Sequence, residues 1–319
     1  MQAQFLIGVA AAVFAAFSWS LNFVAPYVVG PYTIYDMAVT RFLLSGILGL
    51  LLFVAVKDQG ARTATGDWLV AAWLGFVGYV GYFVTIMAAV RFAGPIIPPA
   101  IVATVPVVLA IAGNQGPQAT SWRVLSLPLG FIALGLVMVN WPGLIAALNG
   151  LSTSVIAGVA ISFGAVSLWT AFALSNRNAL KKRPTMDPRK WTAMMMIGGA
   201  IEIALFVPVA THLSLLNFAS LGLQWPSFGI ILLSSLVLAA VGSIAGSWAW
   251  TIASKRLPIG LAGQLIVTET VFATSFGLVA SRRWPTFNEA VGVGAIVCGV
   301  VLALKVLPSS TVEAQEVVT

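Results

Sequence analysis

The sequence predicts an all-α polytopic membrane protein with ten transmembrane helices, arranged as two inverted five-helix repeats. Three observations predict it: an apolar composition, an internal repeat, and a one-sided distribution of basic residues. Of the 319 residues, 60% are hydrophobic and only 8% are charged, whereas soluble domains carry about 25% charged residues. The apolar stretches are longer than a strand or a soluble core helix requires, which indicates membrane spans.

Ten apolar segments are candidates for helices that cross a bilayer, since a crossing takes about 20 residues. The first segment begins at Phe5 with no basic stretch before it, so we expect a retained helix and not a signal peptide. Gly94-Pro95 is a helix breaker that separates the third segment from the fourth. The expected spans are 5–25, 33–56, 68–91, 95–112, 123–141, 154–176, 191–213, 226–253, 258–281 and 287–307.

An internal repeat relates the two halves of the chain at an offset of 164 residues. The matched positions are Gly78 with Gly242, Gly130 with Gly294, Gly135 with Gly299, and the segment 104–107 (TVPV) with 268–271 (TETV). Two copies of one helical unit are typical of secondary transporters.

Basic residues fall mainly on one side of the expected membrane. The loops on the N-terminal side, with the end of the last span, hold 12 Lys and Arg, the opposite side holds 3, and Arg41 lies within a span. Because cytoplasmic loops are enriched in Lys and Arg, we expect both termini in the cytoplasm and the protein in the plasma membrane, the inner membrane of a bacterium. Five spans per half is an odd number, so the second copy enters from the opposite side and the repeats are inverted.

The expected organisation follows from the repeat. The first repeat covers 1–141, a linker 142–153, and the second repeat 154–307. The polar, acidic segment 308–319 is a cytoplasmic tail that we expect to lack regular structure.

Several functional classes are disfavoured by what the sequence lacks. His, Cys, Asp and Glu form no metal-ligand pattern, and the chain has no phosphate-binding loop of the G-x-x-x-x-G-K-[ST] type, so neither a metal nor another cofactor is expected. No nucleophile–base pair stands out within the spans, so we do not expect an enzyme. The net charge of +7 resides in loops that set orientation, so no nucleic-acid partner is expected. The expected partners are the lipid bilayer and a small solute; a monomer is compatible with the sequence, which does not fix the oligomeric state.

A substrate site between inverted repeats is expected near the membrane midplane, on helix faces that carry polar and aromatic residues. In the first span Trp19 and Asn22 share a face, and the sixth span repeats this pattern around Trp169. The third and eighth spans carry tyrosines and tryptophans beside small residues, which allow close helix approach. The expected substrate-binding residues of these spans are Trp19, Asn22, Tyr79, Tyr82, Trp169, Trp248 and Trp250.

Two carboxylates are expected deep in the membrane, Glu269 in the ninth span and Glu202 in the seventh. A charge at that depth costs roughly 2.5–3.5 kcal/mol, so each should face a cavity, pair, or be protonated. Glu269 is the first candidate for proton coupling and for substrate contact, with Glu202 second for coupling; the alternative for Glu269 is a neutral acid bonded to backbone or to a neighbouring helix. Gln264 is a further candidate contact. Arg41 is expected to be structural, by pairing with carbonyls or reaching the interface.

These patterns carry a resemblance to a known family. The first-span motif Phe17-S-Trp19-S-L-Asn22-F-V-A-Pro26, the matched segments 104–107 and 268–271, and the paired glycines of the fifth and tenth spans resemble the drug/metabolite transporter superfamily. Within it the whole chain is most similar to the EamA-type ten-helix exporters and, more narrowly, to the YddG-like aromatic amino acid exporters. The resemblance implies a basket-like bundle whose cavity is lined by spans 1, 3, 4, 6, 8 and 9. Relatives often have Glu-Pro in the ninth span where this chain has Glu269-Thr270, which puts a proline hinge there in doubt.

The charge of the spans restricts the substrate. Transport of phosphates or nucleotide sugars would require several Arg or Lys at the midplane, and only Arg41 lies within a span. A small neutral or zwitterionic solute with an aromatic part fits better. The first hypothesis is therefore a secondary exporter of amino acids, aromatic or neutral, and of similar amphipathic solutes, working by alternating access. The alternative is an exporter of cationic drugs or dyes, such as quaternary ammonium compounds, with Glu269 or Glu202 as counter-ion.

Overall fold

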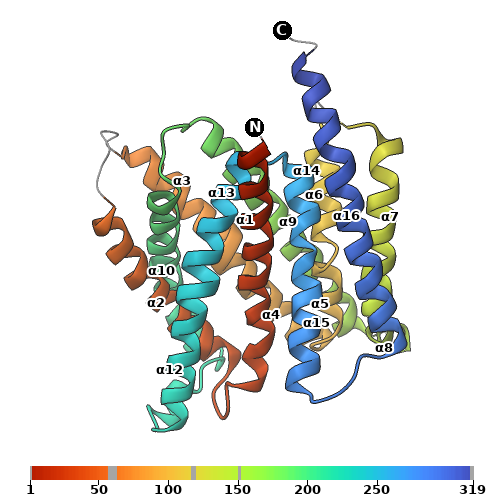
Figure 1. Cartoon of the computed structure of the whole chain (residues 1–319). Helices are drawn as coiled ribbons and strands as arrows, with labels where there is room; N and C mark the ends of the chain where they lie inside the picture. The colour runs from red at the N-terminus through yellow and green to blue at the C-terminus, as the bar shows by residue number, and fades with distance from the viewer. Residues whose placement is uncertain (1, 57–62, 116–119, 150–151, 317–319) are drawn as a thin grey trace.

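Long helices run side by side in one bundle, and α1 begins at the same end of the bundle at which α16 ends (Figure 1). The computed structural model describes residues 2–56, 63–115, 120–149 and 152–316. In that part of the chain there is no strand, and nine helical segments are long and apolar enough to cross a membrane. The prediction of an all-helical membrane protein is confirmed.

The helices of the first half are α1 (Gln2–Ser20), continued by the 3₁₀ segment η1 (Leu21–Tyr27), then α2 (Ile34–Ala55), α3 (Thr65–Gly75), the π-helical η2 (Phe76–Val80), α4 (Gly81–Ala93), α5 (Ile97–Val102), α6 (Val105–Gly113), α7 (Trp122–Val139) and α8 (Trp141–Asn149). Those of the second half are α9 (Thr153–Lys181), α10 (Pro188–His212), α11 (Phe218–Leu221), α12 (Ser227–Val237), the π-helical η3 (Leu238–Ala245), α13 (Gly246–Arg256), α14 (Ile259–Ile266), α15 (Thr268–Ala280) and α16 (Phe287–Glu316). The segments α3–η2–α4, α12–η3–α13 and α14–α15 each form one continuous span.

Three predicted features differ from the structure. The fourth predicted span is two short helices, α5 and α6, which together are shorter than the other spans. Most of the predicted linker 142–153 is helical, because α8 begins with Trp141-Pro142 and proline is tolerated in a first helical turn. The predicted unstructured tail continues α16 as far as Glu316, since extending an existing helix fixes only one more residue per hydrogen bond; residues 317–319 lie outside the described part.

Backbone irregularities recur at the offset of the sequence repeat. Residues 76–80 form η2, and the same positions shifted by 164, 240–244, lie within η3. The break between α5 and α6 at Ala103 corresponds to the break between α14 and α15 at Val267. In each break a threonine hydroxyl donates to the carbonyl three residues earlier: Thr104 to Ile101 (2.6 Å) and Thr268 to Leu265 (2.7 Å). A hydroxyl supplies the hydrogen bond that a broken helix cannot obtain from lipid, so the ninth span breaks without a proline.

Contacts between helices of the two halves also recur at the offset of 164 residues. Helix α1 packs on α13 and α4 on α9, while α2 packs on α10, α6 on α14 and α7 on α16. A Cβ added to Gly135 of α7 would lie 2.6 Å from the Gly292 carbonyl oxygen and the Ile296 side chain. A Cβ added to Gly299 of α16 would lie 2.8 Å from the carbonyl oxygen of Pro128 and the side chain of Ile132. Each contact is the other displaced by 164 residues, which is the pattern that a two-fold relation would produce.

The start of α2 is fixed by Asp36, which is fully buried. Its carboxylate accepts hydrogen bonds from the backbone N–H and hydroxyl of Thr33 (2.8 and 3.0 Å), which completes a capping box. It also accepts from the backbone N–H groups of Asn217 (3.0 Å) and Phe218 (3.2 Å). One side chain thus joins α2 to the start of α11 on the side of the bundle opposite the N-terminus.

We expect the Asp36→Ala substitution to destabilise the protein by about 3 kcal/mol, because it leaves several buried donors without an acceptor. Asp67→Ala is the matched control, since Asp67 pairs with Arg183 (2.6 Å) near the surface and such pairs contribute at most about 1 kcal/mol. Melting temperatures of both variants in the same detergent would check this. Equal shifts would show that Asp36 contributes no more than a surface pair.

Basic residues gather where α1 begins. Arg256, at the end of α13, donates to Gln4 Oε1 (2.9 Å), and Lys255 donates to the carbonyls of Pro184 (3.0 Å) and Met186 (2.9 Å). In the loop before α10, a hydrogen bond from Arg189 lowers the pKa of Asp187. The loops that the charge count places on one side of the membrane therefore do meet at one end of the bundle.

Candidate functional site

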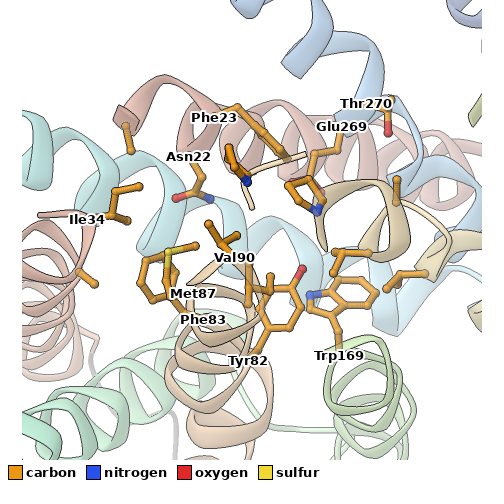
Figure 2. A pocket seen from close by; sticks show the side chains of 18 of the residues that line it. Asn22, Phe23, Ile34, Tyr82, Phe83, Met87, Val90, Trp169, Glu269 and Thr270 are labelled. Atoms are coloured by element: carbon orange, nitrogen blue, oxygen red, sulfur yellow. The ribbon is translucent and has the colours of Figure 1, made fainter. Parts of the chain in front are cut away.

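A cavity of about 290 Å³ lies inside the bundle between η1, α2, α4, the α5–α6 pair, α9, η3 and the α14–α15 pair. Its outer part is lined by Ile34 at the start of α2, Val90 at the end of α4, and Pro95. These positions lie at the end of the bundle opposite the N-terminus, and the inner part reaches Trp169 and Glu269 (Figure 2). The cavity therefore extends from mid-bundle toward that opposite end.

A smaller compartment of about 70 Å³ adjoins the cavity at its inner end. The six residues that line both spaces are Asn22, Arg41, Tyr82, Phe83, Trp169 and Glu269. The compartment adds Trp19, Phe42, Gly78 and Tyr79. Polar and charged groups are thus concentrated at the inner end, whereas the outer part is mostly apolar.

Three tryptophans pack together beside the small compartment. The ring centroids of Trp169 lie 5.9 Å from Trp19 and 5.4 Å from Trp250, and those of Trp19 and Trp250 are 5.9 Å apart. Trp19 Nε1 donates to the Gly242 carbonyl (3.0 Å), which fixes α1 against η3. Toward the N-terminus, Ala12, Ala15 and Ala16 of α1 are fully buried. This part of α1 is therefore closely packed against its neighbours, and the tryptophan cluster lies between it and the cavity.

Glu269 stands in the first turn of α15, immediately after the break at Val267, and lines both spaces. Among the described residues it has no ion pair, and no side-chain hydrogen bond joins it to a neighbour. The positive end of a helix dipole favours a carboxylate at this position. The break after α14 thus places an acidic group at the cavity wall.

Arg41, for which a structural role was predicted, also lines the cavity. Its side chain lines both spaces, although the residue is only 6% exposed. Nε donates to Ser243 Oγ (3.1 Å), Nη1 donates to Asn22 Oδ1, and the guanidinium lies over the Phe42 ring. In the part of the chain that the structure describes, its guanidinium bonds side chains and no backbone carbonyl, because helix α2 directs it toward η1 and η3. Asp36, five residues earlier, is occupied by the cap of α2.

Six of the nine predicted substrate-binding residues line the two spaces: Trp19, Asn22, Tyr79, Tyr82, Trp169 and Glu269. Trp248 does not, because it is 40% exposed on the outside of α13, whereas Trp250 is fully buried. Two residues along an α-helix are about 200° apart around its axis, so only one of the two tryptophans faces inward. Trp250 packs against Trp19 and Trp169 and does not line the cavity.

Gln264 and Glu202 also lie away from the cavity. Gln264 is fully buried in α14, which packs on α6 and α1, and among the described residues its amide has no hydrogen-bond partner. Glu202 is half-buried on α10, a helix that packs on α2 and α3 and contributes no residue to either space. In this conformation, neither Gln264 nor Glu202 is among the residues that line the two spaces, and the roles predicted for them stay predictions.

The lining residues that the sequence reasoning did not propose for the site include Arg41, Phe83 and Met87. A signal for two of them existed, since Phe83 and Met87 follow Tyr79 at a spacing of four and extend its helix face. The fourth predicted span, 95–112, which the resemblance places among those that line the cavity, does contribute Pro99, Val102, Ala103 and Pro106.

These features define a multi-pass α-helical membrane protein with a central cavity that holds an acidic and a basic side chain. No family model matches the chain. It is similar to the inner membrane protein YtfF of Escherichia coli (strain K12), at 28% identity over 94% of this chain and 96% of that protein. A solved structure described only as "Crystal structure of protein" has the same fold, with a TM-score of 0.73 over 95% of this chain and 98% of the other, at 19% identity.

Proposed function

We propose that this protein is a secondary transporter that exports amino acids, aromatic or neutral, across the inner membrane. The observation that carries the proposal is the cavity: a space inside a membrane bundle that is lined by aromatic, acidic and basic groups, with the tryptophan cluster at its inner end. Its volume is at the lower limit for small-molecule sites, which span roughly 300–1,000 Å³. It therefore suits one small solute and not a nucleotide sugar.

The transport mechanism that we propose is alternating access between two inverted five-helix repeats, as in drug/metabolite transporters of the EamA type. The reciprocal helix contacts and the matched breaks at Ala103 and Val267 support this arrangement. With both termini in the cytoplasm, the cavity faces outward, and the tryptophan cluster is the closed inner gate. Opening toward the cytoplasm would require the contacts of Trp19 with Trp169 and Gly242 to separate.

A cation exporter is the second candidate. The aromatic lining and the carboxylate of Glu269, which has no ion pair in the described part, favour it. Arg41 in the same small compartment disfavours it, because a cationic solute is repelled by a guanidinium nearby.

A panel of solutes offered to the purified protein in liposomes tests the proposal. We expect uptake and counterflow of phenylalanine or tryptophan, and weak or no transport of tetraphenylphosphonium and ethidium. Transport of the cations without the amino acids would replace the first candidate by the second. Uptake without trans-stimulation would indicate a channel.

We expect the Trp169→Ala substitution to weaken transport of aromatic solutes more than that of small ones. Trp169 lines both spaces and packs edge-on against Trp19, and an aromatic contact contributes roughly 0.5–1.5 kcal/mol, a factor of about 2 to 12 in affinity. Competition of phenylalanine and of alanine against a labelled substrate would measure it. Equal losses for both competitors would argue against stacking on Trp169.

A further inference from the structure

We propose that Arg41 binds the carboxylate of the transported solute in the small compartment, so that a free carboxylate is required for transport. The inference rests on the proposed function and specifies which group of the substrate is recognised. It starts from the surroundings of Arg41 at the inner end of the cavity.

Arg41 is a cation in the middle of the bundle whose described partners are all neutral. They are the Ser243 hydroxyl, the Asn22 amide oxygen and the Phe42 ring. A charge within a membrane bundle is normally paired or faces a polar cavity. The nearest acidic residue in sequence, Asp36, is held by backbone donors of Thr33, Asn217 and Phe218. In the described part of the chain, no ion pair joins Arg41 to Asp36 or to Glu269.

The geometry leaves donors available to a ligand. A guanidinium has five N–H donors in a planar fork, and the described residues engage only Nε and Nη1 of Arg41. Asn22 holds the fork in place, because its own amide nitrogen donates to the Trp19 carbonyl (2.7 Å). Gly242 faces the remaining nitrogen: a Cβ added there would lie 3.6 Å from Nη2. A planar carboxylate matches such a fork in a bidentate contact.

A second observation points to a ligand in the same place. The hydroxyl of Tyr79, a residue 7% exposed, lines the small compartment, close to the Ser247 hydroxyl and to the Arg41 guanidinium, and can donate to a bound anion. The compartment, about 70 Å³, is large enough for ordered water, so it suits a small polar head group. The larger, mostly apolar space then accepts the side chain of the solute. Glu269, which lines both spaces, is placed to face the amino group.

Three solutes that differ in one group test the inference: phenylalanine, phenylalaninamide and phenethylamine. For the unmodified protein in liposomes, we expect phenylalanine to compete for a labelled substrate roughly tenfold to hundredfold better than the other two, because they lack the carboxylate. For Arg41→Gln we expect the affinity for phenylalanine to fall by a similar factor, so that the three solutes compete equally well. Arg41→Lys should recover part of the preference, since it keeps the charge without the fork.

Arg91→Gln serves as the matched control, because Arg91 lies at the end of α4 and lines neither space; it should keep the preference of the unmodified protein. Equal transport of all three solutes by the unmodified protein would overturn the role of Arg41 and leave amino acid transport intact. Transport of phenethylamine without phenylalanine would overturn both proposals. The solute series on the unmodified protein tests the need for a carboxylate even if Arg41→Gln does not fold.

Discussion

The Glu269→Gln substitution is expected to abolish accumulation of substrate driven by a pH gradient. Glutamine keeps the size of the side chain and cannot carry a proton. Glu269 is the one carboxylate that lines the cavity among the residues described, and acidic groups inside membrane bundles commonly relay protons. We expect gradient-driven accumulation to fall at least about tenfold, while counterflow, which moves no net proton, falls much less.

Transport by proteoliposomes with and without a pH gradient measures this effect. Glu202→Gln is the matched control, because Glu202 lies on α10 and lines neither space; it should behave as the unmodified protein. Unchanged gradient dependence in Glu269→Gln would remove that residue from coupling. If only Glu202→Gln lost the accumulation driven by the pH gradient, proton coupling would be assigned to α10, and the proton path would lie outside the cavity.

The second large effect is expected from Gly135→Leu, which should separate α7 from α16. At Gly135 a single added Cβ already lies 2.6 Å from backbone and side-chain atoms of α16, and overpacking of a close contact costs typically 1–3 kcal/mol, and more for a branched side chain against backbone. We therefore expect a loss of at least about 3 kcal/mol and poor yield of folded protein. Gly299→Leu should behave alike, because its contacts on α7 are the reciprocal ones.

The glycines five residues earlier provide an internal control. Gly130 and Gly294 are exposed on the same two helices, and nothing lies within 4 Å of an added Cβ. Gly130→Leu and Gly294→Leu should leave the melting temperature in detergent unchanged or slightly raised. A lower melting temperature in all four variants would mean that the glycines act through backbone conformation and not through contact between α7 and α16.

Hydropathy predicts helices well in this chain because the bilayer imposes one rule on every span: backbone polar groups must be bonded within the segment. The predicted boundaries therefore lie close to those of the long helices, as for α2 and α10. A span that lines a cavity can depart from this rule, because protein groups or water can bond the backbone there. The segment of α5 and α6 lines the cavity and is broken and short. The same reasoning explains the helix in the predicted linker, since nothing in composition distinguishes α8 from a loop that lies on the membrane.

The site could be predicted only in part. Spacing along one helix placed Trp19 with Asn22 and Tyr79 with Tyr82, and all four line the cavity or its inner compartment. The choice between Trp248 and Trp250 depended on which face of α13 meets α1, and neither residue proved to line the cavity. Gln264 lies away from the cavity in this conformation for a related reason: the turn at Val267 directs Glu269 toward the cavity and leaves Gln264 against neighbouring helices.

By itself, the sequence determined that this is a helical membrane protein, where most of its spans lie, and that its two halves share a repeat at 164 residues. Those properties follow from composition and periodicity, which act locally along the chain. Only the tertiary structure decided that Arg41 faces the cavity and that Glu269 lines the same small compartment as Arg41. It also decided that Trp250 packs against Trp19 and Trp169 without lining the cavity. The reason is physical: burial and charge compensation depend on which helices meet, and those contacts join residues as far apart as Arg41 and Ser243.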